Sequence, residues 1–473
     1  MMAKATIPTA RQAQAAARDT GVPHPPELTP FVAQAPLQVM VRSCLEWLID
    51  DQTMQSLFDE VAQGQYTRTL TLDFMVDTML DVACGRHPSA GAALAAYRDR
   101  MQVTRQAFYA KLNRMEPAVG EAIVAHVARL AHNVIAELGA AQNEPIPGYR
   151  TCVVDGTYLG GRTEHRIKPM RQTGSAGLTG MALAVFGLGS RTVRQVILQE
   201  DAYTQERALF KDLDIGTGEV WIADRNFCVR AWLARVHRAH SRFLVRWHRS
   251  ACPFEAIDEL HDAPGSKQGA REQRIWLDDP STGERMQARR IELALNTPTR
   301  NGDTTLVLVT DLPDSVEADT CCDLYRNRWR IETHYLRLTR QLHCEPAGLN
   351  HPRAALFAFA MAVVAGNALA VVQSALQAEH GRAAVEELSY YYVVLVVASV
   401  WEGMSIAVPG HHWDFVRRYP PGELARWLRA LAKSVPIGHF RRSRRGPKKP
   451  PTERQSGAHQ RHVSVKRLLD MAT

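Results

Sequence analysis

A long uncharged stretch near residue 360 places the strongest constraint on how this chain can fold. No acidic or basic side chain lies between Arg353 and Glu379, and residues 354–372 are almost wholly apolar. A stretch of that length could span a bilayer. However, it is rich in alanine, contains Gly366 and Asn367, and has no aromatic belt at its C-terminal end. A helix buried in a large core explains these features better, with a membrane span as the alternative.

The rest of the chain has the size and composition to supply such a core. Its 473 residues suffice for roughly two to four domains, and 45% hydrophobic with 22% charged residues is usual for a globular protein. The formal net charge of +8 favours an anionic partner. The eight cysteines show neither C-x-x-C nor zinc-ligand spacing, so we expect buried side chains in a reducing cytoplasm. The N-terminus lacks the hydrophobic region of a signal peptide.

Helical periodicity dominates the first third of the chain, after an arm (residues 1–29) rich in alanine and proline. Over residues 30–147, apolar side chains recur at spacings of three and four. Ala90–Thr104 and Arg105–Arg114 predict two helices joined by a short turn, with Thr104 as the N-cap of the second. This resembles a helix-turn-helix whose second helix would enter a DNA major groove, although a plain helical bundle gives the same pattern.

The period changes towards two after Pro147, which indicates β-strands. The strand candidates are Thr151–Leu159, Met181–Leu188, Thr192–Leu198, Glu219–Ala223 and Arg242–Trp247, with helices expected at Thr204–Leu213 and Phe227–His240. Three strands followed by alternating helices and strands predict an α/β fold with a mixed sheet. Residues 250–318 interrupt this order with Pro-, Gly- and charge-rich segments and short alternating runs, so we expect a β-rich insertion there. Helical periodicity then resumes and ends before a basic, proline-rich tail, residues 441–473.

Two aspartates lie where predicted strands run out. Asp155 follows Cys152-Val-Val, and Asp224 follows Val220-Trp-Ile-Ala. A carboxylate at the end of a buried strand is held on a rigid base and still reaches solvent, which suits a metal ligand. Each aspartate taken singly could equally form a turn or cap a helix.

Residues 325–339 predict one helix that gathers a phenol, a guanidinium and an acid on one face. Helix positions four and seven apart lie close to the same face. The resulting stripe consists of Tyr325, Arg328, Glu332 and Thr339. A solvated helix with an Arg328–Glu332 ion pair would give the same pattern. If Glu332 instead joins Asp155 and Asp224, three converging acids can hold divalent ions for phosphodiester chemistry.

Together these residues resemble the DDE transposases of bacterial insertion sequences, and more narrowly insertion-sequence family four. The resemblance rests on Asp155-Gly-Thr, Ala223-Asp-Arg-Asn-Phe and Tyr325-Arg-x-Arg-Trp-x-Ile-Glu332, where the family signature is Tyr-x2-Arg-x3-Glu-x6-Lys. It implies a ribonuclease-H-like catalytic core with a β-rich insertion. The expected parts are an arm (1–29), a helical DNA-binding domain (30–147), the core (148–249 and 319–375), the insertion (250–318), C-terminal helices (376–440) and the basic tail (441–473).

The resemblance also implies residue roles and a reaction. Asp155, Asp224 and Glu332 would hold two Mg²⁺ or Mn²⁺ ions, while Tyr325 and Arg328 would grip phosphates beside the scissile bond. Further DNA contacts are expected from Arg225, Arg326, Thr339 and Arg340. Hydrolysis would free a 3′-hydroxyl at each end of the element, and that hydroxyl would attack target double-stranded DNA. Because two ends are cut and joined together, we expect a homodimer in the cytoplasm, associated with the nucleoid and not with a membrane.

Two departures from the family pattern qualify these expectations. The lysine position holds Thr339, which brings no charge; Arg340 lies about 100° around the helix and could reach the same phosphate. The alternative is therefore a DNA-binding protein with an impaired or dead transposase site. The last strand of the insertion, Thr305–Thr310, also lacks the tryptophan with which some relatives stack a flipped base, and Trp276 is more simply a packed β residue. A hairpin route for excision stays open.

Overall fold

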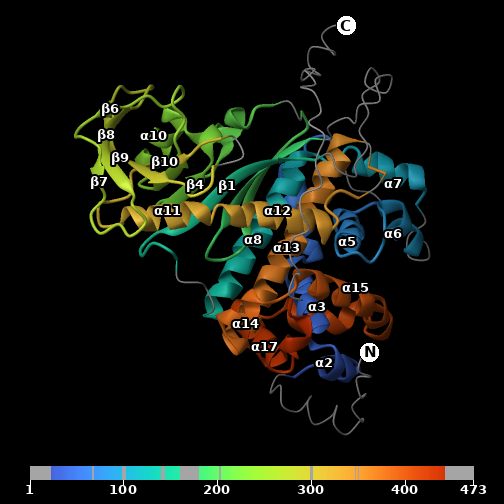
Figure 1. Cartoon of the computed structure of the whole chain (residues 1–473). Coiled ribbons are helices and arrows are strands. Elements are labelled where there is room, and N and C mark those ends of the chain that lie inside the picture. The colour runs from blue at the N-terminus through green and yellow to red at the C-terminus, as the bar shows by residue number, and fades with distance from the viewer. Residues whose placement is uncertain are drawn as a thin grey trace, which may run out of the picture.

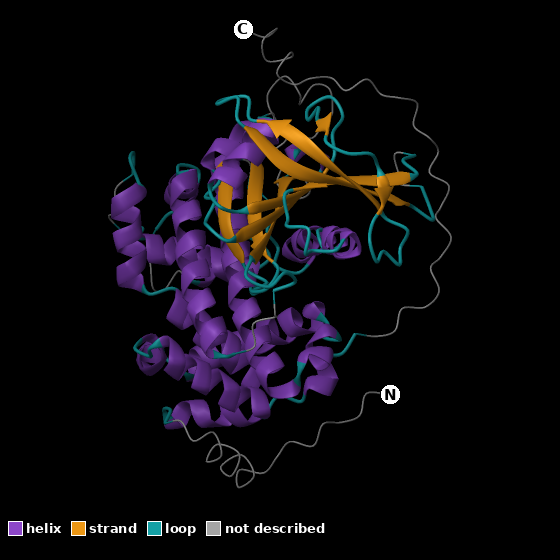
Figure 2. Cartoon of the chain, turned by 90° about the vertical axis from the view of Figure 1, so that its left-hand side faces the viewer, coloured by secondary structure: helices purple, strands orange, loops and turns teal. Residues whose placement is uncertain are grey.

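The computed structural model is a mixed α/β protein in which helices lie beside and beneath a large twisted sheet (Figures 1 and 2). It describes residues 23–65, 69–97, 103–139, 144–159, 180–201, 204–298, 302–346, 348–349 and 351–442. Most of the predicted arm and nearly all of the predicted basic tail lie outside these residues. The α/β class with a mixed sheet is confirmed, while the domain boundaries stay predictions.

Seven α-helices, after the short 3-10 helix η1 (Pro26–Leu28), precede the sheet in the described part of the N-terminal region. They are α2 (Thr29–Gln34), α3 (Pro36–Leu48), α4 (Asp51–Val61), α5 (Leu72–Ala83), α6 (Ala90–Ala96), α7 (Arg105–Leu112) and α8 (Pro117–Glu137). Thr104 caps α7 as predicted, because its Oγ1 accepts the N–H of Ala107 at 3.1 Å. The segment that joins α6 to α7 lies outside the described residues, so the helix-turn-helix stays a prediction.

Five strands form the part of the sheet that carries the two aspartates. They are β1 (Arg150–Tyr158), β2 (Met181–Gly187), β3 (Val193–Gln199), β4 (Glu219–Ala223) and β5 (Arg242–Arg246), close to the predicted strands. Their order is β3-β2-β1-β4-β5, with β1, β4 and β5 parallel and with β2 and β3 antiparallel to their neighbours. Buried apolar side chains cover both faces of these strands, in two separate core clusters.

The predicted insertion continues this same sheet. It contributes β6 (Glu255–Ala256), β7 (His261–Asp262), β8 (Arg271–Asp278), β9 (Arg285–Ala294) and β10 (Thr305–Thr310). The last of these strands pairs antiparallel with β5, so the region lengthens the sheet in place of forming a separate layer. Its β-rich character agrees with the sequence prediction.

The helical stretch predicted at Thr204–Leu213 is confirmed, although it is not an α-helix. The chain there forms a 3-10 helix, η2 (Glu206–Asp212), followed after β4 by η3 (Arg225–Phe227) and α10 (Arg230–Arg238). The guanidinium of Arg235 on α10 donates to the main-chain carbonyls of Phe210, Lys211 and Leu213. Those carbonyls are thus satisfied by a side chain, and the segment ends without a further helical turn.

The single helix predicted at 325–339 is wrong, because the helix is interrupted at Asn327 and Arg328, within the first turn of that range. Helix α11 (Ala318–Arg326) ends before α12 (Trp329–Arg340) begins. The N–H of Arg328 bonds the carbonyl of Tyr325 at 3.0 Å, and that of Arg330 bonds Asn327 at 2.9 Å. These i→i+3 bonds make a tight turn between two helices that run nearly in line (Figure 1).

The uncharged stretch forms α13 (Pro352–His380), which runs through the middle of the helical layer (Figure 1). After it come α14 (Arg382–Glu386), α15 (Tyr390–Ala407), α16 (Asp414–Arg417) and α17 (Pro421–Lys433). By length and composition α13 and α15 could each cross a membrane, but the apolar window of α13 is 100% buried against other parts of the protein. It packs on α3, α5, α8 and α17, so its composition is that of a core helix. All eight cysteines are buried and free, as predicted.

Candidate active site

The three predicted acids approach one another at one end of the parallel strands. Asp155 lies on β1, and Asp224 comes directly after β4, the parallel neighbour of β1. Asp224 also caps η3, because its Oδ1 accepts the N–H of Asn226 at 2.7 Å. Helix α12 brings Glu332 to the same place, and Tyr335 fixes this helix against β1 by donating to the carbonyl of Asp155 at 2.6 Å.

Arg328 links two of the acids. Its Nη2 lies 2.7 Å from Oε1 of Glu332, and its Nη1 lies 3.6 Å from Oδ2 of Asp155. The side chains of Arg328 and Asp155 are only 15% and 16% exposed, so this is a partly buried network and not a surface ion pair. Arg328 occupies the tight turn between α11 and α12, which places its side chain beside both carboxylates.

The site concentrates negative charge. Burial raises the pKa of Asp155 to about 7, and the charges of Asp224, Glu206 and Glu332 add to the rise, while Arg328 opposes it. Burial raises the pKa of Tyr325 too, with Asp224 adding and Arg328 opposing. A cation among these acids would therefore be bound favourably.

A fourth acid, Glu206, was missed by the sequence prediction. Burial and the charge of Asp224 raise its pKa, and Nδ2 of Asn226 lies 3.5 Å from its Oε2. The carboxylate reaches the site because Gly156 has no side chain: a Cβ there would lie 2.3 Å from Oε1 of Glu206. A glycine directly after the predicted Asp155 was the one available signal, but it named no partner.

Arg225, another of the predicted DNA contacts, takes part in an ion-pair network. Nη2 of Arg225 lies 3.2 Å from Oδ2 of Asp303, which also pairs with Arg246 at 2.6 Å, another residue that the sequence prediction missed. These residues line a cavity of about 610 Å³ together with Trp247, His248 and Arg249. Arg225 directly follows Asp224 in the chain, so one wall of this cavity lies next to an acid of the site.

The remaining candidates are not gathered at the acids. Arg326 pairs with Asp323 on the exposed side of α11. Thr339 donates to the carbonyl of Tyr335 at 3.0 Å, within its own helix, and Arg340 is exposed. Thr339 therefore contributes no charge and directs its hydroxyl to the helix backbone.

The residues fit a divalent cation in kind but are not arranged around one. Carboxylate oxygens are the donors that Mg²⁺ and Mn²⁺ prefer, and the negative charges of Asp224, Glu206 and Glu332 act on Asp155 in a way that favours a nearby cation. Within the described ranges, however, no group of three His, Cys, Asp or Glu side chains stands close enough to hold a metal ion. Arg328 stands between Asp155 and Glu332 and supplies the positive charge instead.

One family model matches the part of the chain that contains these residues. Residues 146–367 match the family model of the transposase DDE domain. The match covers less than half of the chain and contains Asp155, Asp224 and Glu332. No curated protein matches the chain. A solved structure described as a piggyBac transposase synaptic complex with hairpin DNA is similar at 10% identity and a TM-score of 0.40, over 89% of this chain and 88% of that one, a similarity too low to support a conclusion.

Proposed function

We propose that the protein is a DNA transposase of insertion-sequence family four, with a ribonuclease-H-like core. The observation that carries the proposal is the approach of Asp155 and Glu332 to the partly buried guanidinium of Arg328, on which Asp224 also acts through its charge, inside the region that matches the transposase DDE domain. The strand order β3-β2-β1-β4-β5, with its parallel and antiparallel pairs, supports a ribonuclease-H-like core. The N-terminal helices would recognise the terminal inverted repeats.

The three acids would hold two Mg²⁺ or Mn²⁺ ions once Arg328 turns away from them. When bound, such ions activate water or a 3′-hydroxyl and stabilise the leaving oxygen. Arg328 would then bind the phosphate beside the scissile bond with Tyr325, exchanging carboxylate partners for a phosphate. Tyr335 would keep Glu332 in register with Asp155 throughout. Water and then the freed 3′-hydroxyl serve as nucleophiles, so the side chains position the reactants without forming a covalent intermediate.

The protein would act as a homodimer on paired element ends, in the cytoplasm and associated with the nucleoid. Cleavage of double-stranded DNA bearing the flanking inverted repeats, in the presence of Mg²⁺, tests the proposal directly. Glu332→Gln should lower the cleavage rate on the order of 10³-fold or more while DNA binding persists. Glu259→Gln, an exposed loop acid, is the matched control and should cleave normally. Undiminished cleavage by the Glu332 variant would refute the site.

A DNA-binding protein with an impaired site is the second candidate, and Thr339 favours it. Its hydroxyl is bound within α12, so the lysine position of the family contributes no charge here. Specific binding of the repeats by the wild-type protein without any cleavage, across Mg²⁺ and Mn²⁺, would select this candidate.

A further inference from the structure

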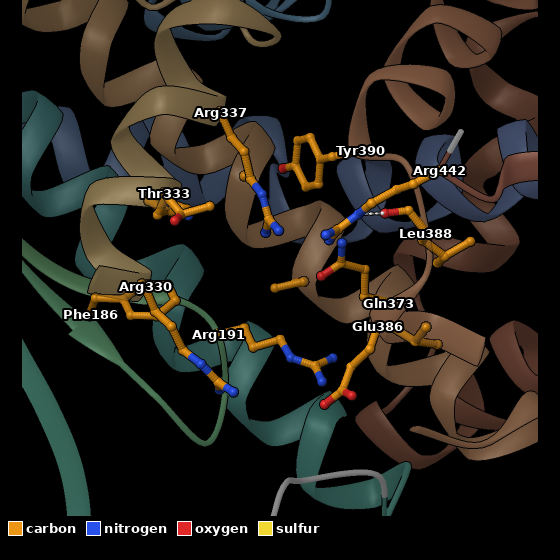
Figure 3. Close-up of a pocket in the computed structure, with 14 residues that line it drawn as sticks. Phe186, Arg191, Arg330, Thr333, Arg337, Gln373, Glu386, Leu388, Tyr390 and Arg442 are labelled. Carbon is orange, nitrogen blue, oxygen red and sulfur yellow. Dashed lines mark hydrogen bonds between the residues drawn. The ribbon is translucent and has the colours of Figure 1, made fainter. Parts of the chain in front are cut away.

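A second cavity lies on the side of α12 away from Glu332. It encloses about 360 Å³ between the β2–β3 turn, α12, α13 and the segment after α17. Figure 3 shows four arginines gathered around it from separate parts of the chain. They are Arg191, Arg330, Arg337 and Arg442, and we call this site the arginine cavity.

Two of these arginines are held in place by neutral groups. Nη2 of Arg191 donates to Oε1 of Gln377 at 2.8 Å, and Nε of Arg442 donates to the carbonyl of Leu388 at 2.8 Å. Arg191 also adopts a φ of 60°, a left-handed conformation that costs free energy for a residue other than glycine. The chain thus tolerates backbone strain at a residue that directs its charge into the cavity.

A third arginine stacks on an aromatic ring. The guanidinium of Arg337 lies 5.0 Å from the ring centroid of Tyr390, and Figure 3 shows it directed toward Arg442 across the cavity. Burial lowers the pKa of Arg337, and the charges of Arg442 and Arg330 lower it further against the opposing effect of Tyr390. Burial and the charges of Arg330 and Arg382 likewise lower the pKa of Arg191, to about 10. The folded protein therefore holds mutually repelling cations together.

The described carboxylate in the lining offsets only part of this charge, because Glu386 acts on Arg191 and Arg330 but is one acid against four arginines. Glu386 is the acid among the described residues that line the cavity, and its Oε1 accepts from Nε of Arg382 at 2.7 Å. Glu386 thus already has a partner, and Arg382 adds a further positive charge beside the four lining arginines. Such a surplus of guanidinium groups is suited to an anion with several oxygens.

A buried imidazole also faces the arginine cavity. His334 lines it, is 6% exposed and contacts Phe186, with the two rings tilted by 39° and their centroids 5.0 Å apart. Its Nε2 has no hydrogen-bond partner within the described part of the chain. A buried polar nitrogen left without a partner indicates that a ligand or water completes the site.

We propose that the arginine cavity binds a phosphate group of the DNA backbone, at a second site separate from the one beside the scissile bond. The proposal rests on the proposed transposase function. Arg330 and Arg337 share one face of α12, whereas Glu332 lies roughly 140–160° around the same helix. Glu332 and Arg337 are about 7.5 Å apart along the helix axis, on nearly opposite sides of a helix about 10–12 Å across. A strand engaged at Glu332 would therefore pass around α12 and reach the cavity several nucleotides away, at about 3.4 Å per phosphate along one strand.

The salt dependence of DNA binding tests the proposal. Full-length wild type, Arg191→Gln, Arg337→Gln and the double variant would be titrated with inverted-repeat DNA at several KCl concentrations, with the exposed Arg429→Gln as control. Loss of one phosphate contact should lower affinity about tenfold and reduce the slope of log K against log[salt] by about 0.9. Because both arginines would bind the same phosphate, the double variant should lose about 0.9 and not twice that amount. Unchanged slopes in all three variants would overturn the proposal.

A measurement without DNA separates failure of the cavity from failure of the transposase function. The Tm of each protein would be compared in inorganic phosphate and in chloride at equal ionic strength. Wild type should gain stability in phosphate, and Arg337→Gln should not. Stabilisation by phosphate without any change in the DNA slopes would assign the cavity to a free anion and overturn the DNA proposal. If wild type binds no DNA at all, the transposase function fails, while the phosphate measurement still reports on the cavity.

Discussion

At the scale of single residues, Gly156 determines how close a fourth carboxylate comes to the acids of the site. Because it has no Cβ, Glu206 occupies space that any other residue would fill. Glu206 in turn acts on Asp155 and Asp224 through its charge, and so helps to make the site attractive to cations. Gly156 on β1 thus sets how closely Glu206 can approach the other acids of the site.

Gly156→Ala should therefore displace Glu206 and mimic its removal. The clashing atom is the end of a flexible side chain, so we expect the fold to persist and cleavage to fall several-fold, with a higher Mg²⁺ requirement. Glu206→Ala should have a similar effect, and the double variant should be no worse than either single one. Additive losses in the measured cleavage rates would show that Gly156 acts by another route.

At the residue scale, the sequence was informative where a residue's position along a strand could be inferred. Asp155 and Asp224 could be expected where strands run out because they follow apolar runs, and Glu332 was proposed because it lies in a motif with Tyr325 and Arg328; their roles stay predictions. Glu206 could not, because its importance depends on a glycine that is distant in sequence and adjacent only in the folded chain.

At the scale of elements, two side chains attach helices to the edge strand β3. Oε1 of Glu121 on α8 accepts the N–H of Leu198 at 2.6 Å. On α13, Asn367 bonds both main-chain groups of Val193, accepting at 2.8 Å and donating at 2.9 Å. Main-chain groups on the edge strand β3 thus bond side chains of α8 and α13, where another strand would otherwise pair.

Glu121 gives a pH dependence with a definite sign. Burial raises its pKa above the ordinary value of 4.5, although the Leu198 N–H opposes the rise. A raised pKa means that the folded state binds the proton more tightly than the unfolded state does. The protonated Glu121 side chain therefore stabilises the fold at low pH, and this stabilisation is lost as pH rises through the raised pKa. Glu121→Gln should gain stability relative to wild type as pH rises from about 4 to about 7. Urea unfolding at both pH values checks this, and a constant difference would contradict it.

Asn367→Leu should destabilise the protein strongly. It would leave the N–H and the carbonyl of Val193 without partners in a region where Asn367 is 0% exposed, at a cost of about 2–4 kcal/mol. Ser374→Ala is the matched control, because Ser374 bonds only the carbonyl of Ala370 within α13. Denaturant unfolding of both variants measures the difference; equal losses would refute the bridging role.

Element type could be predicted from period and length for β1 to β5 and for α13, but not the break between α11 and α12. Neither Asn327 nor Arg328 is a glycine or a proline, and Arg328 keeps a right-handed helical conformation. Residues compatible with a continuous helix therefore conceal a turn that hydrogen-bond geometry alone reveals.

At the scale of the whole molecule, α13 unites regions that are far apart in sequence. It packs on α3, α5 and α8 from the N-terminal part and on α17 from the C-terminal part, within one hydrophobic cluster. Its burial accounts for a stretch that resembles a membrane span by length and composition. The sequence could indicate that the stretch is buried, but not which helices cover it, because covering helices share the same apolar periodicity.

A fragment of residues 1–147 should consequently fail to fold as a stable unit. Without α13, the apolar faces of α3, α5 and α8 would be exposed, so we expect aggregation or low helicity compared with the same helices in the full chain. Circular dichroism and light scattering check this. A monomeric, cooperatively melting fragment would show that these helices have a sufficient core of their own.

The position of α13 in the chain also sets the order of events during synthesis. The N-terminal helices leave the ribosome long before Pro352, and their apolar faces have no partner until α13 follows. The helix bearing Glu332 packs on α13 as well, so the candidate site cannot be completed before α13 has been made. The apolar faces of the N-terminal helices are therefore exposed to aggregation until α13 leaves the ribosome, after which the core and the candidate site form together.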